Sequence, residues 1–164
     1  MAELTNLESK LGEVLGLAMA AQGATEKVKK LPELEAELAQ RLDKMQQEAK
    51  ETEERATEVA SSFEGKKTAI LEEARDVKQK ATDMMQDYLD RASDALDGFE
   101  FLTMAEAGEV GHWEILRTLN ERARHAELQQ LVDWALPIQQ RHFEQAREGS
   151  LQLAASEDPN ETSG

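Results

Sequence analysis

Apolar residues recur at steps of three and four positions along most of this chain, a pattern typical of helices that bury one face. The first such stretch covers about residues 6–30 and starts at Thr5 and Glu8, whose spacing forms a capping box. A second helix is expected to begin at Pro32 and to end at Gly65. No segment has the period of two that strands require. The sequence therefore predicts an all-α protein, an antiparallel bundle of helices.

The second half of the chain continues the same pattern. Three further helices are expected at about residues 66–96, 99–120 and 125–148. The first of them is polar and rich in alanine, with Met84 and Tyr88 among its inward positions, and Pro137 should kink the last. Residues 1–150 are thus interpreted as a single domain. The acidic tail, residues 151–164, has little to bury and is expected to be disordered.

The first helix carries a narrow stripe of small residues on a segment without charge. Gly12, Gly16, Ala20 and Gly23 line this stripe and permit a close approach of another backbone. The approaching backbone could belong to another helix of the same bundle or to a second chain. We expect the protein to form a homodimer or another homo-oligomer.

The charge of the chain limits its partners. Thirty-four acidic and 19 basic side chains give a formal net charge of −15. A field of this sign repels phosphate backbones and anionic lipids, so neither nucleic acid nor a membrane is an expected partner. The chain has no cysteine, which excludes disulfides and thiolate metal sites. It also lacks a signal-peptide pattern and an apolar run of about 20 residues, so the expected location is the cytoplasm.

Two polar residues interrupt the apolar stripe of the fourth predicted helix. Glu109 and His112 occupy expected inward positions with the spacing E-x-x-H, which places a carboxylate and an imidazole on adjacent turns. Such a pair can bind an iron or manganese ion, and Glu106, one turn earlier, can join it. The alternative interpretation is a buried Glu–His hydrogen bond that fixes the register of the helices.

Other helices offer further candidate ligands. Glu48 and Glu51 lie close to a run of small core positions in the second helix. His142 is an expected inward residue of the fifth helix, three positions after Gln139. If the fourth and fifth helices form a hairpin, His142 is expected nearer to Glu100 than to His112, too far for a compact site. The candidate metal ligands are Glu109, His112, Glu106, Glu51, Glu48 and His142.

Several short segments carry a likeness to a known family. They are Glu51-Thr52, the Gly65-Lys66-Lys67 turn with Ala69-Ile70-Leu71-Glu72-Glu73 after it, the run from Val110 to Ile115, and a closing helix with Leu131, Leu136 and Gln139. With these segments the chain, over roughly residues 35–147, resembles the ferritin-like superfamily and most closely the YciF-type family of bacterial stress-associated ferritin-like proteins. The resemblance implies a four-helix bundle with an additional crossover helix and a non-haem dimetal centre.

The likeness to that family is uneven at the metal ligands. Identities typical of the family stand at Glu51, His112 and Glu114. Glu48 stands where a histidine is common and Gly111 where a glutamate is common, and Arg55 and Gln139 are further departures. An arginine near the pocket would oppose the binding of a cation. The resemblance therefore implies a degenerate site.

Three functional interpretations follow from these observations. The first is a ferritin-like protein of stress or iron physiology that binds iron or manganese through a degenerate carboxylate and histidine site. The second is a metal-free helical structural or interaction protein with a buried polar network. The third is an active dimetal oxidase or ferroxidase, for which the ligand set is incomplete.

Overall fold

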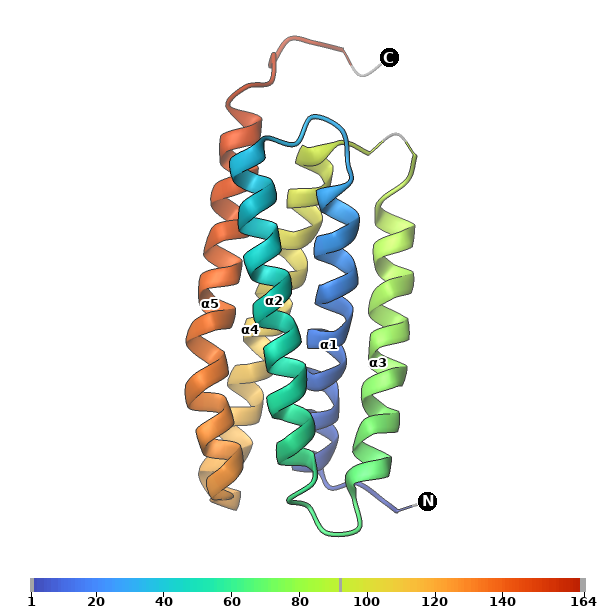
Figure 1. Cartoon of the computed structure of the whole chain (residues 1–164), viewed down its shortest axis with the longest axis vertical. Coiled ribbons are helices and arrows are strands. Elements are labelled where there is room, and N and C mark those ends of the chain that lie inside the picture. The colour runs from blue at the N-terminus through green and yellow to red at the C-terminus, as the bar shows by residue number, and fades with distance from the viewer. Residues whose placement is uncertain (1, 92, 163–164) are drawn as a thin grey trace.

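The structure is a computed structural model that describes residues 2–91 and 93–162, and within them it is all-helical. Five helices follow one another along the chain (Figure 1), namely α1 (Asn6–Lys29), α2 (Ala36–Ala60), α3 (Lys67–Tyr88), α4 (Ala95–Ala123) and α5 (Ala126–Ala154). Short loops join them, so each helix runs antiparallel to the one before it. The predicted all-α class is confirmed.

Among the five helices, α1 makes the most extensive contacts with the others. It packs against α2, α3 and α4, while α5 packs against α4 and α2. Helix α3 contacts mainly α1 and lies at the side of the molecule away from α5 (Figure 1). The centre of the molecule is therefore enclosed by α1, α2, α4 and α5, and α3 covers α1 from outside.

Side-chain caps fix where several helices begin. The Thr5 and Glu8 capping box starts α1, as the sequence predicts. A second capping box, between Asp94 and Asp97, starts α4 at Ala95, four residues before the predicted start at residue 99. His125 begins α5, because its Nδ1 accepts the backbone N–H of Leu128 at 3.3 Å. Each cap satisfies backbone donors that have no partner inside the helix.

The predicted start of the second helix at Pro32 is wrong. Helix α2 begins at Ala36, and Pro32 lies in the preceding turn, where its carbonyl oxygen accepts the N–H of Ala95 at 3.0 Å. Glu33 has a φ of 69°, and this left-handed conformation does not occur inside a right-handed helix. The turn thus extends to Glu35 and connects to the start of α4.

Two other predictions near helix ends also need correction. Met84 and Tyr88 are exposed, whereas Met85 and Leu89 are buried in their place. The end of α3 presents a face that is rotated by one residue from the predicted stripe. Helix α5 continues past residue 148 to Ala154, because Leu153 has an apolar cluster to pack against. Residues 155–162 are exposed and form turns.

The small-residue stripe of α1 is filled within the chain. A Cβ atom on Gly16 would lie 2.4 Å from the carbonyl oxygen of Ala74, and one on Gly12 would lie 2.9 Å from the Glu73 side chain. Helix α3 thus occupies the upstream half of the stripe. A Cβ atom on Gly23, by contrast, would meet nothing within 4 Å. The expected homodimer stays a prediction, and Gly12 and Gly16 are not its seam.

The apolar core is divided into two clusters. One contains Leu11, Leu15 and Trp113, and the other contains Phe99 and Leu102. In each of α2, α4 and α5, a stretch with buried polar side chains separates the residues of one cluster from the residues of the other. This arrangement places a polar layer between the two clusters, at the middle of the bundle.

Candidate functional site

The polar layer contains four buried side chains from two helices. Glu106 and Glu109 of α4 are 1% and 6% exposed, and Gln139 and His142 of α5 are 7% and 3% exposed. Glu48 of α2 reaches the same layer, with a side chain that is 17% exposed. Buried acids are rare unless they are paired, so this layer is the strongest candidate for a functional site.

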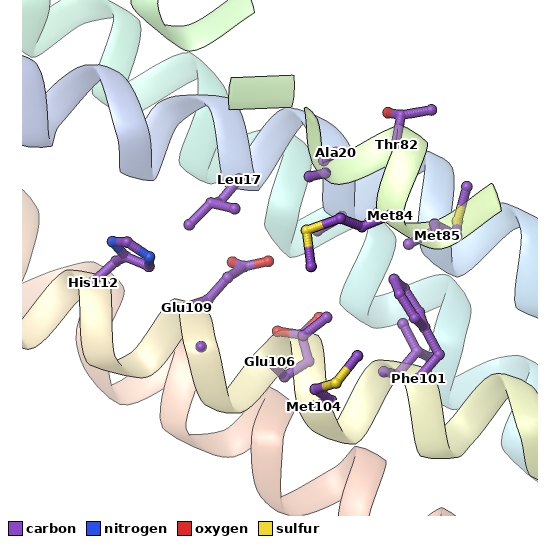
Figure 2. Close-up of a pocket in the computed structure, with 16 residues that line it drawn as sticks. Leu17, Ala20, Thr82, Met84, Met85, Phe101, Met104, Glu106, Glu109 and His112 are labelled. Carbon is purple, nitrogen blue, oxygen red and sulfur yellow. The ribbon is translucent and has the colours of Figure 1, made fainter. Parts of the chain in front are cut away.

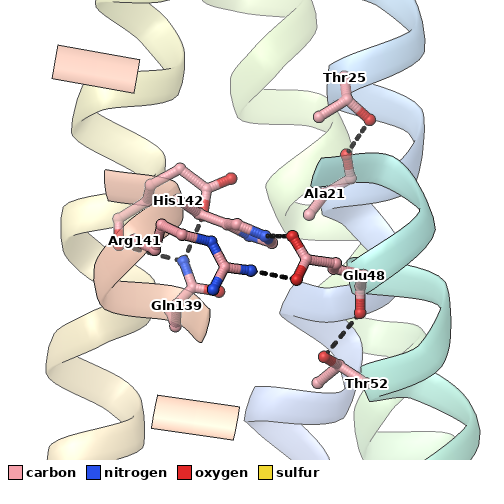
Figure 3. Close-up of polar contacts among 8 residues, drawn as sticks. Ala21, Thr25, Glu48, Thr52, Gln139, Arg141 and His142 are labelled. Atoms are coloured by element: carbon pink, nitrogen blue, oxygen red, sulfur yellow. Dashed lines mark hydrogen bonds and ion pairs between the residues drawn. The ribbon is translucent and has the colours of Figure 1, made fainter. Parts of the chain in front are cut away.

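His142 lies between the carboxyl groups of two other helices. Its Nε2 is 3.2 Å from Oε1 of Glu48 (Figure 3). Its Nδ1 is 4.0 Å from Oε2 of Glu106. Burial lowers the pKa of His142, and the hydrogen bond to Glu48 offsets only part of this effect. A neutral imidazole therefore donates Nε2–H to the Glu48 carboxylate, which can only accept, and Nδ1 faces Glu106 as an acceptor.

Glu48 holds its charge in this layer. Burial acts to raise the pKa of Glu48, but hydrogen bonds from Arg141 and His142 and the positive charge of Arg141 together lower it. The Arg141 guanidinium group donates to Oε2 of Glu48 and His142 contacts Oε1, as Figure 3 shows. Glu48 is thus an ionised carboxylate whose charge is balanced by arginine.

Glu106 is protonated more readily than an ordinary glutamate. Burial raises its pKa to about 7, although the amide of Gln139 donates a hydrogen bond to its Oε2 and acts in the opposite direction. Near neutral pH the Glu106 carboxyl group is therefore divided between its neutral and ionised forms. This places a titrating acid within reach of a buried imidazole.

Glu109 differs from the other acids because it has no polar partner among the described residues. Burial raises the pKa of Glu109 well above its ordinary value, and the nearby Glu106 raises it further. Glu109 thus favours its neutral, protonated form far more than an exposed glutamate does. Its carboxyl group extends from α4 toward Leu17 and Met84 (Figure 2).

A pocket of about 240 Å³ opens in front of Glu109. It lies between α1, α3 and α4, and its lining is mainly apolar. Its lining includes the small residues Ala20 and Ala24 of α1. Met84 of α3 lies near Ala20, and Met104 projects from α4 (Figure 2). The pocket therefore joins an apolar space to two buried carboxyl groups, Glu106 and Glu109.

The structure brings together only some of the predicted ligands. Glu48, Glu106 and His142 meet in the polar layer, and Glu109 lies beside them. The expectation that His142 is too far away is wrong. Helix α4 continues to Ala123, beyond its predicted end, which moves the centre of the α4–α5 hairpin and places His142 level with Glu106.

Glu51 and His112 lie outside this layer. The Glu51 side chain is 47% exposed and pairs with Arg55, which covers the ring of Trp134 at 4.2 Å. His112 is 39% exposed, and its Nδ1 lies 3.2 Å from Oε2 of Glu13, at the edge of the molecule. The predicted inward position of His112 is therefore wrong, whereas Glu109 is buried as predicted.

Sequence reasoning missed the parts played by Arg141 and Gln139. The arginine expected near the pocket was Arg55, but the arginine that reaches the buried acids is Arg141. Gln139 was expected only as a departure from the family pattern, and its amide donates a hydrogen bond to Glu106. The spacing of Gln139 and His142 does indicate one shared face of α5. No sequence signal indicates that the half-exposed Arg141 turns back toward Glu48.

The arrangement of these residues does not fit the dimetal centre that the family resemblance implies. Among the described residues, one group of three acids has ligand atoms within 4.8 Å of one another, Glu33, Asp94 and Glu157. These acids lie near helix ends, two of them are exposed, and such groups are common without a metal. In the polar layer, donors from Arg141 and Gln139 already occupy the carboxyl groups of Glu48 and Glu106.

Two further findings bear on the identity of the chain. No helix in the described ranges combines the length and the apolar character needed to cross a membrane. Comparisons with protein-family models, with curated proteins and with solved structures find no match to this chain.

Proposed function

We propose that this chain is a ferritin-like helical-bundle protein in which a polar side-chain network stands at the place of the metal centre, and that it acts as a metal-free structural or interaction protein. The contacts between helices support this fold. Helices α1, α2, α5 and α4 contact one another in a closed ring, and α3 connects α2 to α4 while packing mainly on α1. This position of α3 supports our interpretation of it as the crossover helix that the family resemblance implies.

One observation carries the proposal. Arg141 supplies a fixed positive charge to Glu48, the carboxylate that a metal ion would need. The amide of Gln139 donates to Glu106 in the same layer, and His142 is neutral and engaged with Glu48. Arg141 therefore neutralises Glu48, and donors from the protein already occupy both carboxyl groups of the layer.

A second candidate is a degenerate mononuclear site for iron or manganese in stress or iron physiology. The observation that favours it is the position of His142 between two carboxyl groups, so that three ligand side chains from three helices surround one point. Loading this site would require Arg141 to leave Glu48 and Glu106 to lose its proton. The candidate therefore predicts that metal binding strengthens as the pH rises toward about 7 and levels off above it.

Metal content and thermal melting separate the two candidates. The full chain is purified without chelator, analysed for iron and manganese, and melted with and without Mn(II), or Fe(II) under anaerobic conditions. The metal-free network predicts that less than about a tenth of the chains retain metal and that neither ion raises the melting temperature. A ligand present at about 100 times its dissociation constant would instead add about 2.7 kcal/mol to the free energy of unfolding.

Two histidine variants identify the site if metal does bind. His142→Gln removes the imidazole from the polar layer, and His112→Gln is the matched control at a half-exposed position. Stabilisation by metal that is lost in His142→Gln and kept in His112→Gln would overturn the metal-free proposal and establish the mononuclear site. Stabilisation that both variants retain would place the ion elsewhere and leave the polar layer free of metal.

A further inference from the structure

The pocket between α1, α3 and α4 has an opening that solvent reaches. Met84 and Met104 border it and are 62% and 51% exposed, while the Glu109 side chain inside is buried. Methionine side chains are flexible and polarizable, and they adapt to apolar ligands of different shapes. The pocket thus has an adaptable apolar entrance and a polar group at depth.

The depth of the pocket contains a polar group that lacks a partner. Glu109 is only 6% exposed. It makes no hydrogen bond or ion pair with any residue in the described part of the chain. Its carboxyl group points into the pocket (Figure 2). Buried polar groups in folded proteins nearly always have a hydrogen-bond partner, and the pocket leaves space beside Glu109 for a bound molecule to supply one.

The volume of the pocket limits the size of such a ligand. A cavity of about 150 Å³ accommodates a benzene molecule. The volume here is about 240 Å³, which leaves room for an aromatic ring and a short side chain. Most of the lining is apolar, so the larger part of the ligand is hydrocarbon.

The charge of the site selects the polar end of the ligand. Two carboxyl groups, Glu106 and Glu109, face the pocket, and the chain has a formal net charge of −15. The net charge repels an anion and attracts a cation, and a bound ammonium group would favour the ionised form of the two buried acids. An ammonium group offers three donors to carboxyl oxygens and neutralises one carboxylate, whereas a hydroxyl group offers one donor and no charge.

We propose that this pocket binds a small apolar molecule that carries a protonated amine, with the ammonium group at the Glu109 and Glu106 carboxyl groups and the hydrocarbon part between the helices. The inference goes beyond the proposed function and concerns a space beside the polar network. It also gives the unpaired Glu109 a role, because an ammonium group would supply the donor that no described residue supplies.

Three compounds of one shape test the proposal on the full chain. Phenethylamine, phenethyl alcohol and phenylpropionate share a phenyl ring on a short chain and differ in charge. Binding is measured by isothermal titration calorimetry near neutral pH and at an ionic strength of about 0.15 M, which screens non-specific attraction of cations. Phenethylamine is expected to bind at least about tenfold more tightly than the alcohol, and the carboxylate is expected not to bind.

Two pairs of variants assign the binding to this pocket. Glu109→Gln keeps the shape and removes the carboxyl group, so it should weaken phenethylamine at least about tenfold while Glu114→Gln, at an exposed position of the same helix, should not. Gly108→Leu should block the pocket. A Cβ atom at Gly108 meets nothing within 4 Å, and the same is true of Gly111, which does not line the pocket, so Gly111→Leu is the matched control.

Several results would overturn the proposal. One is that the wild-type chain does not bind the amine, and another is that it binds the amine and the alcohol with equal affinity. A third is that Glu109→Gln or Gly108→Leu binds the amine as tightly as the wild type does. If Glu109→Gln fails to fold, as judged by circular dichroism, the Gly108→Leu and Gly111→Leu pair still decides whether the pocket is the site. The metal experiment above is independent of all these outcomes.

Discussion

Single side chains at the middle of the bundle have charge states that their exposed counterparts would not have. Glu109 is buried and unpartnered among the described residues, and its pKa is raised by burial and by Glu106. In the unfolded chain the same group titrates near the ordinary glutamate pKa of 4.5. Above this pH the unfolded state loses a proton that the folded state keeps, so the contribution of Glu109 to stability is fully present below pH 4.5 and declines as the pH rises toward the folded-state pKa.

The Glu109→Gln variant isolates this contribution. Glutamine has the shape of the protonated carboxyl group and does not titrate, so the variant should gain stability relative to the wild type between about pH 5 and about pH 8. The gain is at most about 1.4 kcal/mol per pH unit. The free energy of unfolding is measured with urea at both pH values. His142 is present in both chains, so its opposite pH dependence, a loss of stability as pH falls below 6.5, cancels in the difference.

An exposed glutamate of the same helix provides the control for this pH dependence. Glu114→Gln, on an exposed position of the same helix, should differ from the wild type by the same amount at both pH values. A difference between Glu109→Gln and the wild type that does not grow with pH would show that Glu109 is ionised in the folded state. The assignment of a neutral carboxylic acid in the pocket would then fail.

The sequence predicted the buried acids better than their partners. Glu109 follows directly from an apolar stripe with a period of 3.6 residues, because a polar residue on such a stripe has to point inward. His112 lies three residues later and is rotated by about 60° around the helix, which is enough to bring it to Glu13 at the edge of the molecule. Periodicity gives the face of a residue only to within about one position. Long side chains such as Arg141 then choose among several neighbours.

At the scale of helices, the contact between α1 and α3 depends on two glycines. Gly16 allows the backbone of α3 to approach so closely that a Cβ atom would lie 2.4 Å from the carbonyl oxygen of Ala74. A backbone atom inside a helix cannot move aside as a flexible side chain can. The stripe of small residues on α1 is therefore a packing surface for α3.

Alanine substitutions at two positions of α1 test this contact. Gly16→Ala should lower the free energy of unfolding by about 2 kcal/mol, because the clash with Ala74 outweighs the gain in helix propensity. Gly23→Ala should raise it by about 0.5–1 kcal/mol, because Gly23 has open space around it and alanine favours the helix. Urea unfolding followed by circular dichroism measures both. Equal stability of the two variants would mean that α3 is not held closely against α1.

The number, type and order of the helices were predictable, and their ends were predictable only where a cap is local. The Thr5 and Glu8 box is such a cap, because both residues act within one turn. The start of α2 depends instead on the left-handed Glu33 and on the bond from Ala95 to Pro32, which join parts of the chain that are far apart in sequence. The extension of α5 to Ala154 depends on an apolar cluster supplied by other helices.

For the whole molecule, the excess of acidic side chains is the dominant electrostatic feature. Several ion pairs in the described part of the chain lie at the surface, and each such pair contributes little to stability. The formal net charge of −15 repels itself more in the compact state than in the unfolded chain. Added salt should therefore relieve more repulsion than attraction.

The melting temperature is expected to rise by several degrees between about 0.01 M and about 0.3 M NaCl, because the screening length falls from about 30 Å to below 10 Å. Choline chloride at the same ionic strength separates screening from specific binding of sodium and should give the same increase. A constant or falling melting temperature would show that the ion pairs outweigh the net charge.

The division of the core into two apolar clusters separated by a polar layer also has a consequence for motion. Each cluster has its own contacts near one end of the bundle, and the layer between them adds hydrogen bonds but little apolar packing. Opening one end exposes one cluster and leaves the other intact. The two ends of the molecule are therefore separate units of local unfolding, and the layer of Glu48, Glu106 and His142 is the boundary at which such an opening stops.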